Sequence, residues 1–246
     1  MIRSIKRKVR KFCMRWMLDH PEDLVLTLGL HYGPETTNLS HLENASIPAK
    51  VDGFHDLAYL FACNKANRGV ISQDFDEAAY IWKTIVTSQP LVLLEIGRWL
   101  GGGTVLHAAA AALHGGKLTS VDLKKKMPAF ADDKVIQKHL TRLGLSNVDI
   151  IIADSREFQP TDFLDYVFID GDHSYEGVKE DYENIISHLK TGGDLLFHDS
   201  CATRPYATLH EPVARLMREL RHDSRVVFQG ELGSISHFKT TGKAAT

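Results

Sequence analysis

The chain has 246 residues, with 29 Lys and Arg against 31 Asp and Glu, which gives a formal net charge of −2 at pH 7. Hydrophobic residues at 43 % and charged residues at 24 % are ordinary for a globular protein, and they exclude disorder, collagen and a disulfide-stapled miniprotein. No apolar stretch approaches the roughly 20 residues of a membrane-spanning helix, and the charge balance gives no reason to expect nucleic acid as a partner. Three widely spaced cysteines suit reduced thiols in a cytoplasmic protein.

Residues 1–20 form a basic segment with seven Lys and Arg and one acidic residue. Its apolar residues recur at the i, i+3, i+4 spacing of one helical face and predict an amphipathic helix: Ile2, Ile5, Val9, Phe12, Cys13, Trp16 and Met17. No uninterrupted apolar stretch follows the cationic residues, which argues against a secretory signal. The helix can pack on its own domain, or it can bind an anionic membrane surface or an acidic partner. We therefore expect a cytoplasmic protein, either free or peripheral to the inner membrane surface.

The next residues predict a connector followed by two helices. Residues 18–50 are rich in Pro, Gly and Asn, and the apolar spacing from Val51 to Gln89 favours two helices separated near Gly69. We divide the chain into an N-terminal helical extension, residues 1–69, and a main domain, residues 70–246. The extension would serve as a lid or as the contact of a homo-oligomer.

After Pro90, short apolar runs alternate with helical patterns. Strands are expected at 91–96, 118–121, 148–152, 166–169 and 195–197, and helices at 105–113, 135–143 and 178–189. Continuous apolar strands between helices indicate a doubly wound α/β fold, a mostly parallel sheet covered on both faces. Two final strands, 225–229 and 235–238, are separated by Gly230 and Gly233 and predict an antiparallel hairpin, which brings the sheet to seven strands.

The loop after the first strand predicts a ligand site, because ligands in such sheets bind beyond the carboxyl ends of the strands. The strand ends in Glu95-Ile96, and Gly97, Gly101 and Thr104 lead into an alanine-rich helix. Glycines let a ligand approach the backbone and leave the first helical amides free. Asp122 ends the second strand 25 residues after Gly97, where a carboxylate commonly holds ribose hydroxyls. These features favour a nucleoside cofactor, either NAD or S-adenosylmethionine.

Glu95 distinguishes between the two candidate cofactors. A carboxylate beside the glycine turn repels a pyrophosphate but can help to hold the ammonium of S-adenosylmethionine. Gly97 and Gly101 are four residues apart, whereas the dinucleotide pattern requires two. Both observations favour S-adenosylmethionine. The third strand ends at Asp154-Ser155, whose side chains could reach the adenine amino group; Asp154 could equally cap the next helix.

Two sets of residues carry a family resemblance. Glu95-Ile96-Gly97, Gly101, Thr104, Asp122, Asp154 and the final hairpin resemble class I S-adenosylmethionine-dependent methyltransferases with a Rossmann-like fold. A second set resembles the group that contains macrolide-sugar O-methyltransferases and cephalosporin-hydroxylase-like proteins: Phe168 to Glu176, Asp181, Gly192-Gly193 and His198-Asp199. The resemblance covers roughly residues 70 to 240. Gly103 departs from it, because related catechol-type enzymes usually place a serine there that can contact the cofactor.

Asp170 and Asp199 follow the fourth and fifth strands. Neighbouring strands lie about 4.8 Å apart, so the two carboxylates can converge on one hard cation such as Mg²⁺. The resemblance implies both as metal ligands and places His198 where related enzymes carry a third, acidic ligand. Histidine is a poor magnesium ligand, which leaves three alternatives: water completes the coordination, a softer ion such as Mn²⁺ binds, or no metal is needed.

His173 stands three residues after Asp170, and the resemblance places the general base of the macrolide-sugar enzymes there. An alcohol needs a base, a cation that acidifies it, or both, before it attacks a methyl sulfonium, and histidine suits the first role. We therefore expect an O-methyltransferase that transfers a methyl group to a hydroxyl of a small molecule, a sugar or a glycosylated natural product, with Asp170 beside the base. The alternatives are an NAD-dependent oxidoreductase and a non-catalytic adaptor that docks on membranes or partners through residues 1–20.

Overall fold

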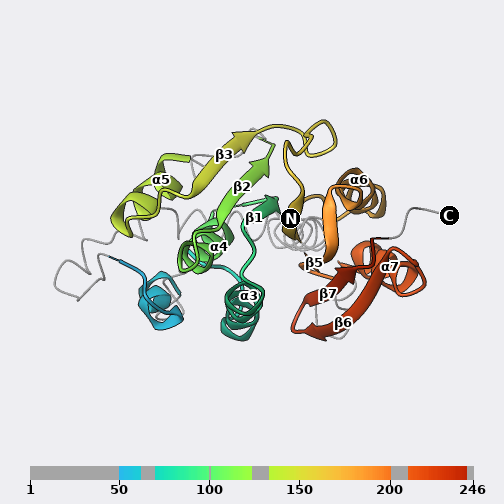
Figure 1. Ribbon diagram of the computed structural model, residues 1–246, viewed down its shortest axis with the longest axis horizontal. Coiled ribbons are helices and arrows are strands. Elements are labelled where there is room, and N and C mark those ends of the chain that lie inside the picture. Colours follow the sequence, from blue (N-terminus) through green and yellow to red (C-terminus); the bar gives the residue numbers. More distant parts are fainter. Residues whose placement is uncertain (1–49, 62–69, 100, 124–132, 201–209, 243–246) are drawn as a thin grey trace, which may run out of the picture.

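A computed structural model describes residues 50–61, 70–99, 101–123, 133–200 and 210–242. The strands form one seven-stranded sheet of order β3-β2-β1-β4-β5-β7-β6 (Figure 1). The first five run parallel and β7 pairs antiparallel with both β5 and β6, which confirms the predicted mostly parallel sheet with a terminal hairpin. The strands are β1 (Val92–Ile96), β2 (Lys117–Asp122), β3 (Val148–Ile152), β4 (Leu164–Ile169), β5 (Leu189–Phe197), β6 (Val226–Leu232) and β7 (Ile235–Thr240).

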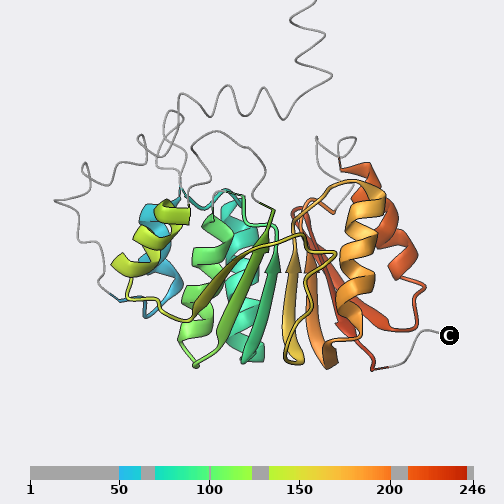
Figure 2. The ribbon, with the colours of Figure 1, turned by 90° about the horizontal axis from the view of Figure 1, so that it is seen from above.

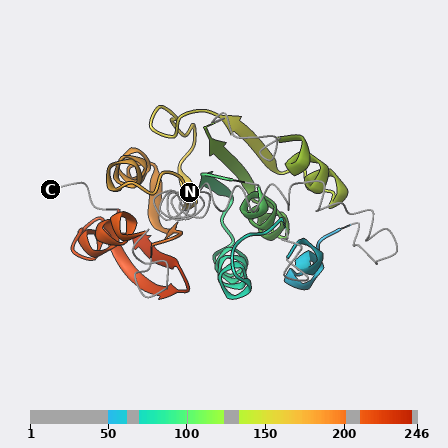
Figure 3. The same cartoon turned by 180° about the vertical axis from the view of Figure 1, so that it is seen from behind.

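Helices cover both faces of the sheet, as the continuous apolar strands predict. The described helices are the 3-10 helix η2 (Phe54–Leu60), α3 (Phe75–Ser88), α4 (Gly102–Ala112), α5 (Asp133–Arg142), α6 (Tyr175–Ile186) and α7 (Glu211–Leu220). In Figures 1 and 3, α3, α4 and η2 lie on one side of the sheet, and α6 and α7 lie on the other. Strand β4 contributes to the apolar core on each face of the sheet, because its side chains alternate between the two faces. Tyr166 and Phe168 belong to the first core, which includes residues of α3 and α4, and Val167 and Ile169 belong to the second core, which includes residues of α6 and α7.

Helix α4 is the central helix, and ten of its eleven residues are buried. Five consecutive alanines, 108–112, give it a narrow apolar surface, so that it packs closely against β2, α3 and α5. A helix buried on all sides has little freedom to move. Gly101 and Gly102, where the glycine loop enters this helix, are buried as well.

Three sequence expectations are corrected. Helix α6 ends at Ile186, and Leu189 begins β5 because its backbone pairs with Leu164 on β4. Gly230 lies inside β6 at a register shift, and the hairpin turns at Gly233-Ser234 instead. Helix α7 was not predicted, although its buried residues Val213, Leu216, Met217 and Leu220 have helical spacing.

Part of the predicted N-terminal extension belongs to the core of the sheet. Val51, Leu57 and Leu60 are at most 5 % exposed and lie in the same apolar cluster as α3 and α4. The basic segment, residues 1–20, lies outside the described residues, and the division of the chain after residue 69 stays a prediction. Among the helices that the structure describes, none is both long and apolar enough to cross a bilayer.

Candidate active site

The candidate site lies at the carboxyl ends of the parallel strands, and these ends together form one edge of the sheet. Strands β1 and β4 are neighbours, as are β4 and β5, so the loops that follow all three emerge side by side. Figure 2 views these strands from the side, with the helices arranged around them. The glycine loop follows β1, Asp170 follows β4, and His198-Asp199 follows β5. The topology thus brings the two sequence motifs to one edge.

Gly97 allows the first two of these loops to touch. Its φ is +82°, and a Cβ at this position would stand 2.1 Å from the carbonyl oxygen of Asp170. The backbone N–H of Asp170 also donates to the carbonyl of Ile96, at 2.8 Å. Any side chain at position 97 would therefore separate the glycine loop from Asp170. Gly101, also at φ +82°, begins α4.

Glu95 is buried at the end of β1, with 1 % of its surface exposed. Its Oε2 accepts hydrogen bonds from the hydroxyls of Thr104, at 2.5 Å, and Ser120, at 2.6 Å. Burial raises the pKa of Glu95 to about 7, and the two hydroxyl bonds only partly oppose this effect. The structure therefore joins two predicted cofactor residues, Glu95 and Thr104, directly to each other beneath the glycine loop.

Glu95 also lies close to the glycine at position 103. A Cβ on Gly103 would lie 2.8 Å from Oε1 of Glu95. The serine of the catechol-type enzymes would thus have to displace this carboxylate.

Asp122 holds the outer part of the same loop. Its Oδ2 accepts from the backbone N–H groups of Arg98, at 2.8 Å, and Trp99, at 3.3 Å. Trp99 has φ +46°, a conformation that costs energy for a residue other than glycine, and its side chain is 43 % exposed. Oδ1 of Asp122 accepts no hydrogen bond within the described part of the chain, so it is the oxygen that a ribose hydroxyl could reach.

The structure places Asp154 and Ser155 in the turn that follows β3. Asp154 accepts from the backbone N–H and the guanidinium of Arg156, which lowers its pKa to about 2. The backbone carbonyl of Ser155 accepts from Asn184 on α6, at 2.8 Å. Asp154 thus stabilises a turn, and no helix begins here. A contact from either residue to adenine stays a prediction.

Two aspartates and three histidines meet beyond β4 and β5. This carboxylate–histidine cluster consists of Asp170, His173, His198, Asp199 and His210. Oδ1 of Asp170 lies 3.2 Å from Nδ1 of His198 and 3.5 Å from Nε2 of His173. Oδ2 of Asp199 lies 3.6 and 3.7 Å from the same two nitrogens, and its Oδ1 lies 3.4 Å from Nδ1 of His210. All the predicted metal ligands and the predicted base thus belong to one cluster.

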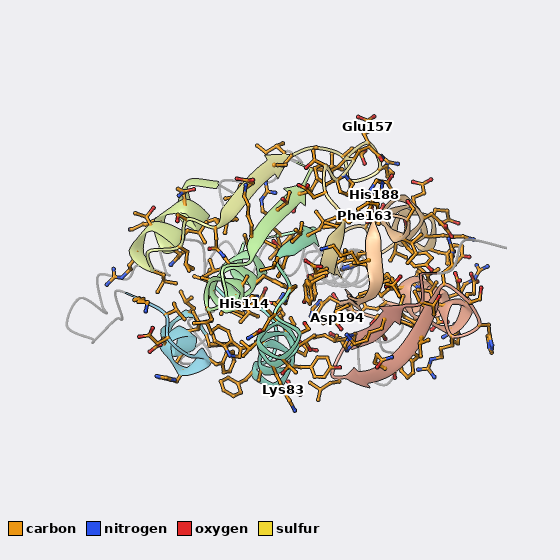
Figure 4. The ribbon with its side chains drawn as sticks, viewed as in Figure 1. Lys83, His114, Glu157, Phe163, His188 and Asp194 are labelled. Carbon is orange, nitrogen blue, oxygen red and sulfur yellow. The ribbon has the colours of Figure 1, made fainter. Side chains whose placement is uncertain are left out.

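The spacing of these atoms also fits a shared cation, although Asp170 forms hydrogen bonds with His198 and His173. An N–H···O bond is about 2.9 Å long, and His237 and Asp194, which is labelled in Figure 4, form such a bond at 2.8 Å. Two ligands of one divalent metal lie about 3.0 to 3.5 Å apart when each is about 2.1 Å from the ion. The contacts of 3.2 to 3.7 Å in the cluster fall near that range. The donors therefore fit a metal ion.

Glu77, which sequence reasoning missed, supports His198 from behind. It comes from α3 and is 2 % exposed. Its Oε2 lies 3.5 Å from Nε2 of His198, and its Oε1 accepts from the backbone N–H and the hydroxyl of Ser234, both at 2.7 Å. With Nε2 directed at a carboxylate, Nδ1 of His198 faces Asp170 and Asp199. No motif surrounds Glu77, so only the fold reveals this role.

His210 is the second residue that the sequence did not single out. It is the N-cap residue of α7, and its side chain makes no capping hydrogen bond. Its ring instead meets that of His173 edge-on, with centroids 5.4 Å apart. Between them, Asp199 has φ +50°. Strain in a non-glycine residue at such a place is common at functional sites.

The pKa of each group in the cluster depends strongly on the charges of its neighbours. Burial alone would raise the pKa of Asp170, but the neighbouring His198 and His173 hold it well below its usual range. Burial alone would lower the pKa of His198, yet the carboxylates of Asp170, Asp199 and Glu77 raise it far above the ordinary value. Its bond to Asp170 raises the pKa of His173, whereas burial lowers that of His210. The carboxylates of the cluster thus favour a bound cation, either a proton on a histidine or a metal ion.

Comparisons with known proteins agree with this architecture. A family model described as a methyltransferase domain matches residues 94–200. A search of curated proteins finds no match. Among solved structures, cofactor-bound Rv0187 from MTB is similar with a TM-score of 0.57 and 15 % identity over 70 % of this chain and 83 % of that chain.

Two further solved structures are O-methyltransferases. TomG from Streptomyces achromogenes, involved in tomaymycin synthesis and solved in complex with SAM, has a TM-score of 0.52 and 15 % identity over 70 % of this chain and 82 % of that chain. The O-methyltransferase from Bacillus cereus, solved in complex with SAH, has the same TM-score and identity over 85 % of this chain and 98 % of that chain. At identities this low, the comparisons establish the fold alone. The family model covers the carboxyl ends of β1 and β5, where the two sequence motifs lie. The chain therefore has the Rossmann-like fold of these methyltransferases, and residues 94–200 match the model of a methyltransferase domain.

Proposed function

We propose that this protein is an S-adenosylmethionine-dependent O-methyltransferase that methylates a hydroxyl of a small molecule, a sugar or a glycosylated natural product. The observation that carries the proposal is the position of His173. Its Nε2 lies 3.5 Å from Asp170 and 3.7 Å from Asp199, on the same edge as the glycine loop. A base thus stands beside the expected cofactor loop. The SAM-bound and SAH-bound neighbours support the choice of cofactor.

The glycine loop offers a separate feature for each part of the cofactor. Oδ1 of Asp122 would bind ribose hydroxyls, while its Oδ2 holds the loop through Arg98 and Trp99. Glu95 is buried, so its charge would act on the methionine ammonium through the first turn of α4 instead of by direct contact. Asp154 and Ser155 complete the set as candidates for the adenine end.

In the proposed reaction, the acceptor oxygen attacks the methyl carbon and the carbon–sulfur bond breaks, with its electron pair remaining on sulfur. Nε2 of His173 accepts the hydroxyl proton, and Asp170 stabilises the imidazolium that forms. General-base assistance contributes roughly 10² to 10⁴ in rate. Alignment of oxygen, methyl and sulfur can supply about 7–11 kcal/mol, so positioning is the larger effect.

Asp170, His198 and Asp199 would hold a divalent cation, Mg²⁺ or Mn²⁺. Bound there, the cation would lower the pKa of the acceptor hydroxyl and orient it. His198 in place of an acidic ligand favours Mn²⁺, because imidazole binds it more readily than Mg²⁺. Glu77 behind His198 restores the negative charge that this exchange removes from the ligand set.

Cofactor binding and product formation test the proposal together. Calorimetry should detect micromolar binding of S-adenosylmethionine and none of NAD. Labelled cofactor should then transfer its methyl group to one of a panel of hydroxylated sugars, glycosides and phenols, and EDTA should abolish the transfer. Binding of NAD alone would favour the oxidoreductase, and transfer only to amines would contradict O-methylation.

For the remainder of the chain, we propose that residues 1–69 contribute a lid or a homo-oligomer contact and that residues 1–20 can associate with an anionic membrane surface. The basic amphipathic pattern supports the second idea. Co-sedimentation with anionic liposomes should decrease when residues 1–20 are removed. Equal sedimentation of both chains would contradict it.

A further inference from the structure

The carboxylate–histidine cluster contains more nitrogen donors than the proposed reaction uses. Asp199 stands between two histidines, with Oδ2 at 3.7 Å from Nε2 of His173 and Oδ1 at 3.4 Å from Nδ1 of His210. The ligand atoms of these three residues lie within 4.8 Å of one another. All three side chains are partly exposed, between 20 and 41 %, so an ion can reach them from solvent.

We propose that His173, Asp199 and His210 form a second cation position, which takes a nitrogen-preferring divalent transition metal such as Zn²⁺ and thereby inhibits methyl transfer. The inhibitory part rests on the proposed function, because it requires His173 to be the base. The binding part rests on the geometry of the three residues alone.

The geometry suits a four-coordinate ion. Zinc binds imidazole nitrogen at about 2.0–2.1 Å and carboxylate oxygen at about 2.0–2.2 Å, so tetrahedral ligands are about 3.4 Å apart. The separations of 3.4 and 3.7 Å require little movement to reach this value, and both exceed a normal hydrogen bond. The fourth ligand would be water. The two histidine rings also contact each other edge-on, with centroids 5.4 Å apart.

The donor chemistry separates this position from that of Asp170, His198 and Asp199. Two imidazoles and one carboxylate favour zinc and its neighbours in the transition series over magnesium, which prefers oxygen. Asp199 is common to both positions, so the two ions would share one carboxylate or compete for it. A metal bound to Nε2 of His173 occupies the lone pair that would accept the hydroxyl proton. Loss of methyl transfer follows directly, without any redox step.

Metal binding to the full chain tests the site without any acceptor. With Mg²⁺ in excess, calorimetry should detect one Zn²⁺ per chain, and Co²⁺ used as a probe should give the intense visible absorption of a four-coordinate ion. In His210→Ala, the affinity for both ions should fall at least about tenfold, the lower end of what even outer-shell changes cost. His222→Ala, which removes an exposed histidine outside the cluster, is the matched control and should bind like the wild type.

Folding of the variant does not limit the test. The His210 side chain makes no capping bond, so His210→Ala and His210→Gln should both keep the melting temperature of the wild type. Zinc should inhibit methyl transfer in the wild type, and His210→Ala should need at least about tenfold more zinc for half-inhibition relative to its own zinc-free rate.

Two results would overturn the proposal. One is equal zinc affinity in the wild type and His210→Ala, since the ion would then sit elsewhere. The other is zinc binding without inhibition of an active enzyme. If no acceptor were ever methylated, the proposed function would fail, while the Co²⁺ spectrum and the zinc affinities would still decide whether the second site exists.

Discussion

His173 is the side chain on which the proposed chemistry depends, because it is a partly exposed imidazole between two carboxylates. His173→Ala should lower kcat by roughly 10² to 10⁴, the usual contribution of a general base, and leave the Kd for S-adenosylmethionine nearly unchanged. Rapid-quench or steady-state rates together with calorimetry would measure both. His188→Ala, at a histidine remote from the cluster and labelled in Figure 4, is the control. An equal loss of rate and cofactor affinity would make His173 structural.

The pH profile gives a second measure of this role. The pKa of His173 is raised by its bond to Asp170, and the base must be neutral to act. The rate should therefore be low in acid and rise with pH through a midpoint above 6.5, the ordinary histidine value. His173→Ala should lose this dependence. A wild-type rate that is flat between pH 6 and 9 would contradict the assignment.

Glu95 provides a test of the cofactor loop. Because its pKa is about 7 in the fold and 4.5 in the reference state, its contribution to stability is largest below pH 4.5 and decreases as the pH rises through 7. Glu95→Gln should therefore gain on the order of 2–3 kcal/mol in the free energy of unfolding relative to the wild type between pH 5 and pH 8. Urea unfolding at both pH values measures this difference, with the exposed Glu157→Gln as control.

Cofactor binding should reveal the same group. The positive charge of the methionine ammonium near Glu95 should lower its pKa of about 7, so binding at pH 7 should release up to about half a proton per molecule of the wild type. Calorimetry in buffers of different ionisation enthalpy counts that proton, and Glu95→Gln should release none. Proton release of the same size from the variant would place the ammonium away from Glu95.

The sequence singled out those candidate site residues whose position follows from one strand. Glu95, Asp170 and His198 each stand at a strand end, and a parallel sheet brings such ends to one edge. Glu77 and His210 could not be found in this way. Glu77 is separated from its partner Ser234 by 157 residues, and His210 reaches Asp199 only because α7 begins there. Contacts of that kind depend on how distant elements pack, which no local pattern contains.

At the scale of elements, α3 connects the first part of the domain to the last. Glu77 on this helix binds Ser234 in the β6–β7 turn and the backbone N–H of Asp74 at its own N-terminus, and it backs His198. Burial would raise its pKa, but His198 and Ser234 lower it to about 2. One carboxylate thus holds a helix, a hairpin and a candidate metal ligand together.

Glu77→Gln should affect both stability and metal binding. The loss of a charged acceptor for Ser234 should cost about 1.5–3 kcal/mol in the free energy of unfolding at pH 7, and the affinity for Mn²⁺ should fall about 10- to 100-fold. Because the pKa of Glu77 is lowered in the folded state, its stabilising effect is present above pH 4.5 and is lost as the pH falls toward 2. The free energies of unfolding of the wild type and the variant should therefore converge in acid. Urea unfolding at pH 7 and pH 3 and Mn²⁺ calorimetry check this. Unchanged metal affinity in a destabilised variant would leave Glu77 a purely structural role.

Helices and strands were predicted correctly where the apolar pattern is strong. Their boundaries were wrong where pairing with a neighbouring strand decides the structure. The five parallel strands were predicted from apolar runs in the sequence; β1 and β4 are almost entirely buried, whereas β3 is partly exposed. Leu189 was assigned to a helix because it continues an apolar pattern, but its pairing with Leu164 makes it a strand. Gly230 read as a turn, yet the sheet accommodates it at a register shift. In both cases, pairing between strands overrides the local signal.

At the scale of the whole molecule, the sheet separates two apolar cores, and the first of them extends beyond the predicted domain boundary. Val51, Leu57 and Leu60 belong to this core, and the carbonyl of Leu60 accepts a hydrogen bond from Ile71, at 3.1 Å. The predicted boundary falls after residue 69, because the two helices expected from Val51 to Gln89 separate near Gly69 and the family resemblance begins near residue 70. The buried residues before that boundary show that the core includes part of the segment assigned to the extension.

A pair of shortened chains decides where the folded unit begins. A chain that starts at residue 70 lacks Val51, Leu57 and Leu60, each of which contributes about 1.5–3 kcal/mol when buried. That loss is comparable to the roughly 5–15 kcal/mol that stabilises a typical domain, so this chain should melt at least about 10 °C below one that starts at residue 50, or should fail to fold. Calorimetric melting of both chains measures the difference. In the full chain, Leu57→Ala should cost about 2–5 kcal/mol, whereas Leu123→Ala, at a side chain that is 43 % exposed, should cost far less. Equal melting temperatures of the two shortened chains would mean that residues 50–69 are an appendage, and the boundary after residue 69 would then stand.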